Sequence, residues 1–496
     1  MPLEGADRPN EPILITKPLE ALANSSFCRV ADAKQFDGNA IRLLRDGPEN
    51  YPAWLAAIAQ ARRTVHLETY MFYEDDVGRM FADALMQAAR RGVKCRVLYD
   101  WLGCRGKASP RFWRILQNAG VEVRCYNPPQ FGNPLLWGSR DHRKALTVDS
   151  EIGFTGGLCI GHDWMGDPAR GILPWRDTAL EIRGPAAAYL SVAFADSWLT
   201  VGQPIPPSDL PAAESIAAQG NAGLWVIAGR PDSMGLYRLE QLVAEIVERS
   251  LWLADAYFVA TTGYVRALTD AAQAGVDVRL LVPSASDLPI VHAVSQAAYR
   301  PLLEAGVRVF EWNGPMMHAK TAVADGCWSR IGSSNSNLAS WVTNRELDVT
   351  VHDTHLAEEM EAMYEDDLTN ATEVVLQYGR VRPVTPRHKT RNRRRRKPGS
   401  AGRFLAGAVG FGSVVGATLA RHRVLGVSES RVLVFAGLIL TALAAVALAY
   451  PQFVSYAIGV VAAWFGITLL VRASKLRHSR PANPQSESSN GGHGPP

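Results

Sequence analysis

The sequence predicts an α/β protein made of two tandem copies of one α/β unit, followed by a C-terminal transmembrane helical hairpin. Three observations lead to this fold class. Four short segments recur in the same order about 180 residues apart. Within each copy, short β-rich runs alternate with runs of helical period, as in α/β units with mixed sheets. Two uncharged apolar runs lie near the C-terminus.

The recurring segments define the two units. They are TVHLETYMF and LWLADAYFV, RRGVKCRVLYD and QAGVDVRLLV, NAGVEVRCYN and EAGVRVFEWN, and DHRKALTVD and MHAKTAVAD. We expect the first unit at residues 35–202 and the second at 223–386, joined by a linker at 203–222 that is rich in Pro, Ala and Ser. The two mixed sheets are expected to pack about a pseudo-twofold axis.

Helical periodicity is clearest between the first two strands of the first unit. Residues 76–91 place polar side chains on one face and apolar ones, including Met80 and Leu85, on the other. Gly92 and Gly275 follow helical runs at matching places in the repeat. A glycine just past the last turn is the usual helix stop. We therefore predict that both glycines end helices before the next strand.

The chain changes character after residue 386. Residues 387–403 hold nine Lys/Arg and no acid, and form a polybasic junction. Within a membrane region at 404–472, the runs 432–450 and 453–471 are uncharged and 19 residues long, enough to cross a hydrocarbon core of about 30 Å. They are expected to form a hairpin, and a buried core hairpin is the alternative. The remainder, 473–496, is expected to be disordered.

Charge distribution indicates orientation and partners. The net charge is +4, yet the residues before the polybasic junction are strongly acidic as a group. This acidic body argues against a large nucleic-acid interface. Cationic flanks on both sides of the hairpin place the catalytic units on the cytoplasmic side of the cell membrane. The junction is suited to an anionic membrane surface, and segment 404–420 is expected to lie in the interface or against the hairpin.

One pattern that carries chemistry, His-x-Lys-x-x-x-x-Asp, occurs twice at matching points of the repeat. The two copies consist of His142, Lys144 and Asp149, and of His318, Lys320 and Asp325. His and Lys two residues apart on a strand point to the same face. After six more residues each copy reaches a small-residue turn, Gly156-Gly157 in the first and Gly332-Ser333 in the second. Two such copies in one duplicated chain indicate a functional site.

These residue types suit a phosphodiester anion. Two lysines supply positive charge to the non-bridging oxygens, and Gly157, Ser333 and Asn335 supply backbone or side-chain donors. One imidazole can attack phosphorus while the other protonates the leaving alcohol and then deprotonates the acceptor. No Cys/His spacing or carboxylate cluster suggests a metal site. We expect no cofactor.

The duplicated motif, with the segments GNAIRLLRDG, ARRTVHLETYMF and WRD, resembles the phospholipase D superfamily and, within it, the bacterial cardiolipin synthases. The resemblance covers about residues 35–375 and implies two tandem phospholipase D-like α/β units. It implies a phosphatidyltransferase that moves a phosphatidyl group from one phosphatidylglycerol to another through a phosphohistidine, with loss of glycerol. His142 would be the nucleophile and His318 the acid and base; the residues alone are symmetric between them.

Further residues are assigned by their place after the motifs. Asp177 and Glu346 are expected to orient the histidines, with a structural salt bridge as the alternative. Asp149 and Asp325 belong to the motif and are expected to brace the fold. The first copy has Gly157 where the superfamily often has serine, so the phosphate is expected to rely more on the second half.

Several alternatives stay open at this point. The same site is compatible with a phospholipase D hydrolase or another phosphatidyltransferase. A nuclease and a non-catalytic membrane scaffold are less favoured, given the acidic body and the two intact motifs. The residues do not determine whether the second lipid is phosphatidylglycerol or phosphatidylethanolamine, nor the oligomeric state.

Overall fold

A computed structural model describes residues 26–129, 138–231, 233–287, 294–377 and 380–383. They all belong to one of the two compact units of the chain. The polybasic junction, the predicted hairpin and the C-terminal tail lie outside the described residues. None of the helices within these ranges has the length and apolar character to cross a membrane.

The first half of the described chain contains α2 (Ser26–Ala31), β1 (Lys34–Arg45), α3 (Asp46–Gln60), β2 (Thr64–Thr69), α4 (Asp76–Arg90), β3 (Lys94–Asp100), α5 (Trp101–Cys104), α6 (Pro110–Asn118), β4 (Glu122–Tyr126), β5 (Ala145–Val148), β6 (Ile152–Gly156), α7 (His162–Met165), η2 (Pro168–Arg170), β7 (Thr178–Arg183) and α8 (Pro185–Leu199). Two short turns of 3-10 helix follow, η3 (Pro207–Asp209) and η4 (Ala213–Ser215).

The second half contains β8 (Ala222–Gly229), α9 (Gly235–Ile246), β9 (Ser250–Asp255), α10 (Thr262–Gln273), β10 (Asp277–Pro283), α12 (Tyr299–Glu304), β11 (Arg308–Trp312), β12 (Lys320–Ala324), β13 (Trp328–Gly332), the π-helical turn η5 (Ala339–Thr343), β14 (Glu346–His352), α13 (Thr354–Thr369), β15 (Ala371–Gln377) and β16 (Arg380–Pro383).

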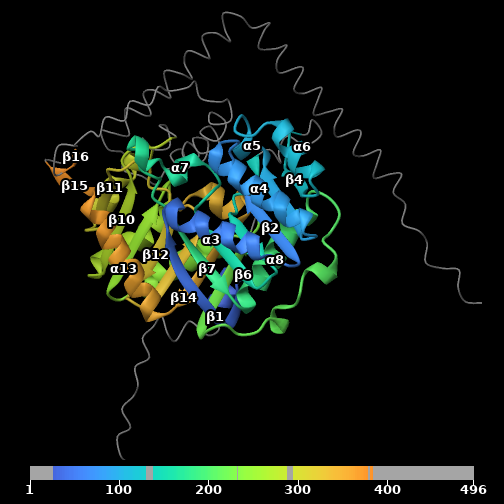
Figure 1. Ribbon diagram of the computed structural model, residues 1–496. Helices are drawn as coiled ribbons and strands as arrows, with labels where there is room; N and C mark the ends of the chain where they lie inside the picture. The colour runs from blue at the N-terminus through green and yellow to red at the C-terminus, as the bar shows by residue number, and fades with distance from the viewer. Residues whose placement is uncertain (1–25, 130–137, 232, 288–293, 378–379, 384–496) are drawn as a thin grey trace, which may run out of the picture. The chain divides into compact units, whose positions relative to one another are not determined.

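The strands form one sheet in which the two halves repeat the same order (Figure 1). The first half follows β1-β7-β6-β5-β2-β3-β4 and the second β8-β14-β13-β12-β9-β10-β11. β1 and β8 pair antiparallel at the centre, so the sheet continues from one half into the other where the sequence predicts two sheets. The pairs β2–β3, β3–β4, β9–β10 and β10–β11 are parallel and the other pairs antiparallel. The predicted α/β class with a mixed sheet is confirmed.

Three large apolar cores hold the sheet and helices together. One lies in the first half under α3, α4 and α6, and a second lies in the second half under α9, α10 and α12. The third combines residues from both halves, among them Leu180, Leu224 and Leu347, with α8 and α13 against it. Because this shared core crosses the boundary, the two halves are fixed relative to each other by apolar burial as well as by strand pairing.

Local signals in the sequence account for several element ends. Gly92 and Gly275 have φ of +91° and +98° just past α4 and α10, as the repeat predicts. The side chain of Asp75 accepts from the Gly78 amide and caps the start of α4. One detail of α4 is wrong in the sequence analysis. Met80 is 44% exposed, because the buried face of this helix is centred on residues such as Phe81.

The segment expected to be a linker is attached to the first half. Asp209 in η3 accepts from Lys94 Nζ at 2.7 Å and from Arg96 at 2.8 Å, both on β3. Its side chain is 5% exposed. These ion pairs fix the beginning of the connection, and η4 contacts α8 further along.

Candidate active site

The two motif histidines meet at the boundary between the halves. His142 lies three residues before the start of β5, and His318 lies two residues before the start of β12. The amide of His142 donates to the carbonyl of Arg345 at 2.9 Å, and the amide of His318 donates to the carbonyl of Arg176 at 2.7 Å. Each motif segment therefore runs beside the segment that precedes a predicted orienting carboxylate in the opposite half.

The carboxylate of Glu346, at the start of β14, faces His142. Nδ1 of His142 lies 3.0 Å and 2.9 Å from the two carboxylate oxygens. Ser333 Oγ donates to Oε2 at 2.6 Å, and the side-chain Nδ2 of Asn344 donates to Oε1 at 3.3 Å. The hydroxyl of Ser333 is thus committed to the carboxylate. The structure therefore places the Ser333 hydroxyl against Glu346 and the Leu347 amide.

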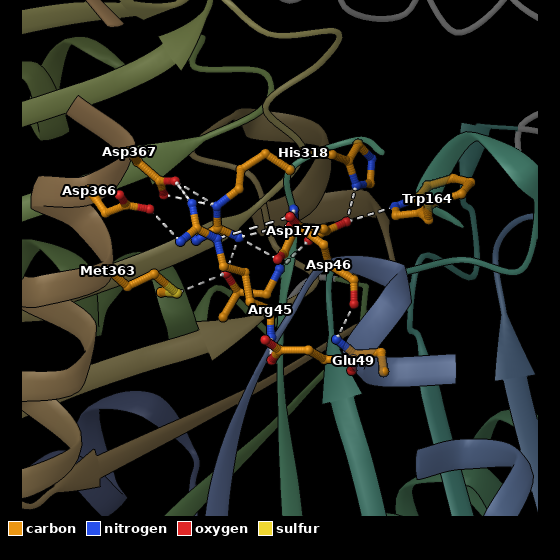
Figure 2. Close-up of polar contacts among 12 residues, drawn as sticks. Arg45, Asp46, Glu49, Trp164, Asp177, His318, Met363, Asp366 and Asp367 are labelled. Carbon is orange, nitrogen blue, oxygen red and sulfur yellow. Dashed lines mark hydrogen bonds and ion pairs between the residues drawn. The ribbon is translucent and has the colours of Figure 1, made fainter. Parts of the chain in front are cut away.

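Asp177 lies in the equivalent position opposite His318. Oδ2 lies 2.7 Å from His318 Nδ1 and accepts from Trp164 Nε1 at 2.8 Å, while Oδ1 accepts from the Thr178 amide at 2.9 Å. Figure 2 shows Asp177 between His318 and Trp164. The pairing is crossed: the carboxylate of each half contacts the histidine of the other half.

Burial sets the protonation of both pairs. It lowers the pKa of His142 to about 4, against the opposing influence of Glu346. Burial and the nearby Lys320 lower the pKa of His318 to about 3, against Asp177. For the two carboxyls burial acts upward, but the histidine and lysine beside each outweigh it and hold the pKa below its ordinary value. At neutral pH both imidazoles are therefore neutral, and with Nδ1–H donating to a carboxylate, each Nε2 carries a lone pair.

The motif lysines lie beside the histidines. Lys144 and Lys320 are 1% and 0% exposed, and each Nζ donates to the carbonyl of its own motif histidine. An ammonium has three donors, so each lysine keeps two for an anion. Burial lowers the pKa of Lys320 to about 8, and Asp177 opposes this shift.

Aromatic rings flank the histidines, and the sequence analysis did not single them out. The Tyr70 ring lies edge-on to His142 with centroids 4.9 Å apart, and the Tyr257 ring lies edge-on to His318 at 6.2 Å. The ring centroids of Trp175 and His318 lie 5.7 Å apart. A signal for the two tyrosines was present, because they occupy the same position in the repeated segments TVHLETY and LWLADAY.

The small-residue turns differ between the halves. A Cβ built on Gly157 would lie 2.0 Å from Asp177 Oδ1, so the glycine makes room for this carboxylate. Asn335 is 4% exposed, and its Oδ1 has no hydrogen-bond partner within the described part of the chain. The position matching Asn335 holds Cys159, a buried free thiol whose pKa is raised by burial.

The motif aspartates lie at the opposite ends of β5 and β12 from the histidines. Asp149 accepts from the amides of residues 62, 63 and 64 at 2.7–2.9 Å. Asp325 accepts from the amides of residues 248, 249 and 250 at 2.7–3.0 Å. Each carboxylate joins its strand end to the start of a neighbouring strand and is far from the imidazoles, so the structure does not bring these two residues into the candidate site.

Two buried arginines next to the carboxylates also contact the opposite half, and no sequence pattern indicated their partners. Arg176 Nε donates to Asp367 of α13 at 2.8 Å and 2.9 Å, and Figure 2 shows Asp367 on the opposite side of Asp177 from Trp164. Arg345 donates to Asp196 of α8 at 2.5 Å. Arg176 and Asp367 are 2% and 3% exposed. Each arginine thereby ties the segment that carries an orienting carboxylate to a helix of the other half.

No cluster of three or more His, Cys, Asp or Glu side chains with the spacing of a metal site occurs among the residues that the structure describes. The polar residues around the two imidazoles are the lysines, carboxylates and small-residue turns already described. As a set they fit a dianionic or monoanionic phosphate group bounded by two nitrogen lone pairs.

The chain is similar to known proteins over most of the described region. Residues 54–163 and 243–368 match the family described as cardiolipin synthase, PLD-like domain. A cardiolipin synthase of Geobacillus sp. (strain WCH70) is 33% identical over 353 residues, which cover 70% of this chain and 69% of the relative. One of Alkalihalophilus pseudofirmus is 33% identical over 348 residues, covering 69% and 68%. The crystal structure of phosphatidylserine synthase from Haemophilus influenzae Rd KW20 has a TM-score of 0.57 at 14% identity, covering 79% of this chain and 98% of that one.

Proposed function

This chain belongs to the cardiolipin synthase family of phospholipase D-like proteins, and from that premise we propose that it transfers a phosphatidyl group from one phosphatidylglycerol to a second, releasing glycerol. The observation that carries the proposal is the crossed pair of buried imidazoles, each held at Nδ1 by a carboxylate of the other half. With each Nδ1 held by a carboxylate, Nε2 of each imidazole is left for the substrate, and we infer that both act on a single phosphate, as a two-step transfer requires.

In the first step Nε2 of His142 attacks phosphorus, and a P–N bond forms as the P–O bond to glycerol breaks. The proton that the leaving glycerol oxygen needs comes from Nε2 of His318. His318 is neutral in the free protein, since burial lowers its pKa. A phosphodiester anion arriving beside it adds negative charge and favours the imidazolium, so we expect a proton to be taken up as the lipid binds.

In the second step a hydroxyl of the second phosphatidylglycerol loses its proton to His318. Its oxygen attacks phosphorus, the P–N bond breaks and its electron pair returns to His142. No proton is gained or lost over the two steps after binding. Lys144 and Lys320 neutralise the non-bridging oxygens in both steps. Both ammonium groups are buried, and the negative charge of a buried phosphate is costly without a positive partner.

Two features support His142 as the nucleophile, in line with the family resemblance. Its side chain is 11% exposed against 2% for His318, so it is the more accessible of the two. Glu346 contacts its Nδ1 with both oxygens, which fixes the ring plane as well as the tautomer. We assign His318 the acid and base role.

The lipid substrates place the protein at a membrane. We propose that the polybasic junction at 387–403 and the apolar runs 432–450 and 453–471 attach it to the cytoplasmic face of the cell membrane, although these residues lie outside the described structure. Phosphatidylglycerol is anionic, so a cationic segment at that surface favours its accumulation near the site. A reporter fused after residue 496 is expected in the cytoplasm, and its detection outside would overturn this orientation.

The test uses the purified full-length chain in vesicles of phosphatidylglycerol, with and without phosphatidylethanolamine. Mass spectrometry is expected to find cardiolipin and free glycerol, and neither from the His142→Ala or His318→Ala variant. Phosphatidic acid without cardiolipin would make water the acceptor and the enzyme a hydrolase. Release of ethanolamine would identify phosphatidylethanolamine as the donor and refute the phosphatidylglycerol assignment.

A further inference from the structure

The two orienting carboxylates are held by different second donors. Ser333 Oγ donates to Glu346 at 2.6 Å, but the position matching Ser333 in the first half is Gly157. A Cβ at Gly157 would lie 2.0 Å from Asp177 Oδ1, which leaves no room for a serine. The second donor to Asp177 comes from outside the motif: the indole Nε1 of Trp164 donates to Oδ2 at 2.8 Å.

Trp164 is fixed from several sides. Its side chain is 0% exposed. Its backbone is packed against α3, where a Cβ on Gly47 would lie 2.4 Å from the carbonyl oxygen of Trp164. Its amide donates to the Gly161 carbonyl at 3.3 Å, and its ring packs on Trp175 with centroids 4.8 Å apart. The Trp164 backbone is therefore held against α3, and its ring is buried and packed beside Asp177.

The same indole contacts the histidine that Asp177 holds. The centroid of its ring lies 5.4 Å from that of His318, with the two planes at 84°. Asp177 Oδ2 accepts from both side chains, and Figure 2 shows the Asp177 carboxylate with one dashed line to His318 and another to Trp164. One residue thus fixes the carboxylate by a hydrogen bond and limits rotation of the imidazole by van der Waals contact.

We propose, on the basis of the phosphatidyl transfer set out above, that Trp164 is a positioning residue for His318. By holding Asp177 Oδ2 and bordering the imidazole, it keeps His318 Nε2 aimed at the oxygen of the leaving alcohol. It acts only through His318 and Asp177 and does not touch the lipid. Trp164 therefore affects only proton transfer by His318. Attack by His142 depends on a separate contact, the one between Glu346 and His142 Nδ1.

Removal of the indole N–H has a definite consequence. In Trp164→Phe the ring contact with His318 is kept in part, but the buried Asp177 carboxylate loses one of its donors. A hydrogen bond to a charged group is strong enough that its loss is expected to lower proton delivery about tenfold. The effect must appear with a leaving alcohol that needs a proton and disappear with one that does not.

The experiment compares two donors in vesicles: phosphatidylglycerol and a phosphatidyl ester of 4-nitrophenol, whose leaving group departs without a proton. First-turnover release of each alcohol is measured for the wild type, Trp164→Phe and Trp164→His. The matched control is Trp341→Phe, which removes a second buried indole N–H, 3.1 Å from Glu240 and outside the site. Thermal unfolding of all four proteins shows whether they are folded.

Trp164→Phe is expected to release glycerol about tenfold more slowly while releasing nitrophenol within about twofold of the wild type. Trp164→His, which keeps a ring N–H, is expected to recover part of the loss, and Trp341→Phe to change both donors by the same factor. Equal slowing of both donors by Trp164→Phe, or no slowing, overturns the positioning role. The identity of the wild-type product tests the proposed function separately, because the donor ratio can be measured whether cardiolipin or phosphatidic acid forms.

Discussion

In the half-site around His142 a glutamate is held by a serine hydroxyl just past the end of β13, whereas in the half-site around His318 a shorter aspartate is held by a tryptophan of the short helix α7. The distances from carboxylate to Nδ1 are nevertheless 2.9 Å and 2.7 Å. In both halves a carboxylate oxygen contacts Nδ1 of the histidine, although Glu346 uses both oxygens and Asp177 uses one, and the groups that hold the carboxylate differ. The comparison therefore separates what the chemistry needs from the local means by which each half provides it.

The largest expected effect comes from removing either histidine. His142→Ala and His318→Ala should each lower cardiolipin formation at least a thousandfold, since one loses the nucleophile and the other the proton donor. The two should differ with the nitrophenyl donor. His318→Ala is expected to release nitrophenol in the first turnover and to accumulate a phosphohistidine, detected by mass spectrometry, while His142→Ala is not. The reverse pattern would exchange the two roles.

The next largest effects are expected when the carboxylates of Glu346 and Asp177 are replaced by amides, and these two variants also distinguish the two half-sites. An amide can present N–H to Nδ1 and favour the wrong tautomer, which is expected to cost about a hundredfold or more in kcat. Glu346→Gln should slow both donors, because it affects the nucleophile. Asp177→Asn should slow phosphatidylglycerol more than the nitrophenyl ester. Glu240→Gln, a buried carboxylate outside the site, serves as control for loss of stability alone.

The two lysines offer a pH test. Burial lowers the pKa of Lys320 to about 8, with Asp177, Asp255, Lys144 and Cys159 as the neighbouring titratable groups. The charged form is lost above that pH, so kcat/KM for phosphatidylglycerol vesicles should fall by up to about tenfold per pH unit beyond pH 8. Arginine stays charged, so Lys320→Arg should remove this limb even if its activity is lower. Retention of the limb at pH 8 in Lys320→Arg would refute the assignment; Lys144→Arg is the matched control.

The smallest effect on activity is expected at the motif aspartates. Asn tolerates the left-handed φ of +53° and +51° found at Asp149 and Asp325. Its side chain, however, replaces one acceptor oxygen of the carboxylate by an amide NH2, which can only donate. Each Asp→Asn variant should lower the free energy of unfolding by about 1–3 kcal/mol. Transfer at a temperature where the protein is folded should stay within about twofold of the wild type. A large loss of kcat without a loss of stability in urea unfolding would show that these residues act in catalysis.

The internal repeat allows most of the fold to be predicted from the sequence. A duplicated α/β unit, helix ends at Gly92 and Gly275, and a mixed sheet all follow from local patterns whose physical basis is short-range. The continuous sheet does not follow, because pairing of β1 with β8 depends on contacts between segments almost 190 residues apart. Met80 was misplaced for a related reason: its exposure depends on which face of α4 meets α3, and periodicity alone gives the faces only approximately.

For the candidate site, the motif residues and both carboxylates are visible in the sequence, and the structure places four of them in two hydrogen-bonded pairs. Their catalytic roles stay predictions. The crossing of the pairs could not be read from spacing, since Asp177 is closer along the chain to His142 than to the His318 that it contacts. When the two motifs are aligned, the position matching Trp164 holds Ser340, so the repeat does not indicate a role for this tryptophan. Arg176 and its partner Asp367 are 191 residues apart, and no local pattern joins them.

The crossed pairing also bears on how such a chain arose and assembles. One half alone carries a histidine, a lysine and a carboxylate, but that carboxylate belongs to a histidine which the half does not possess. A single unduplicated copy could complete a site only by associating with another copy. Joining the two copies in one chain replaces that concentration-dependent encounter by an intramolecular one. The covalent connection thus contributes local concentration, and it freed the two copies to diverge into unlike halves while still forming one site.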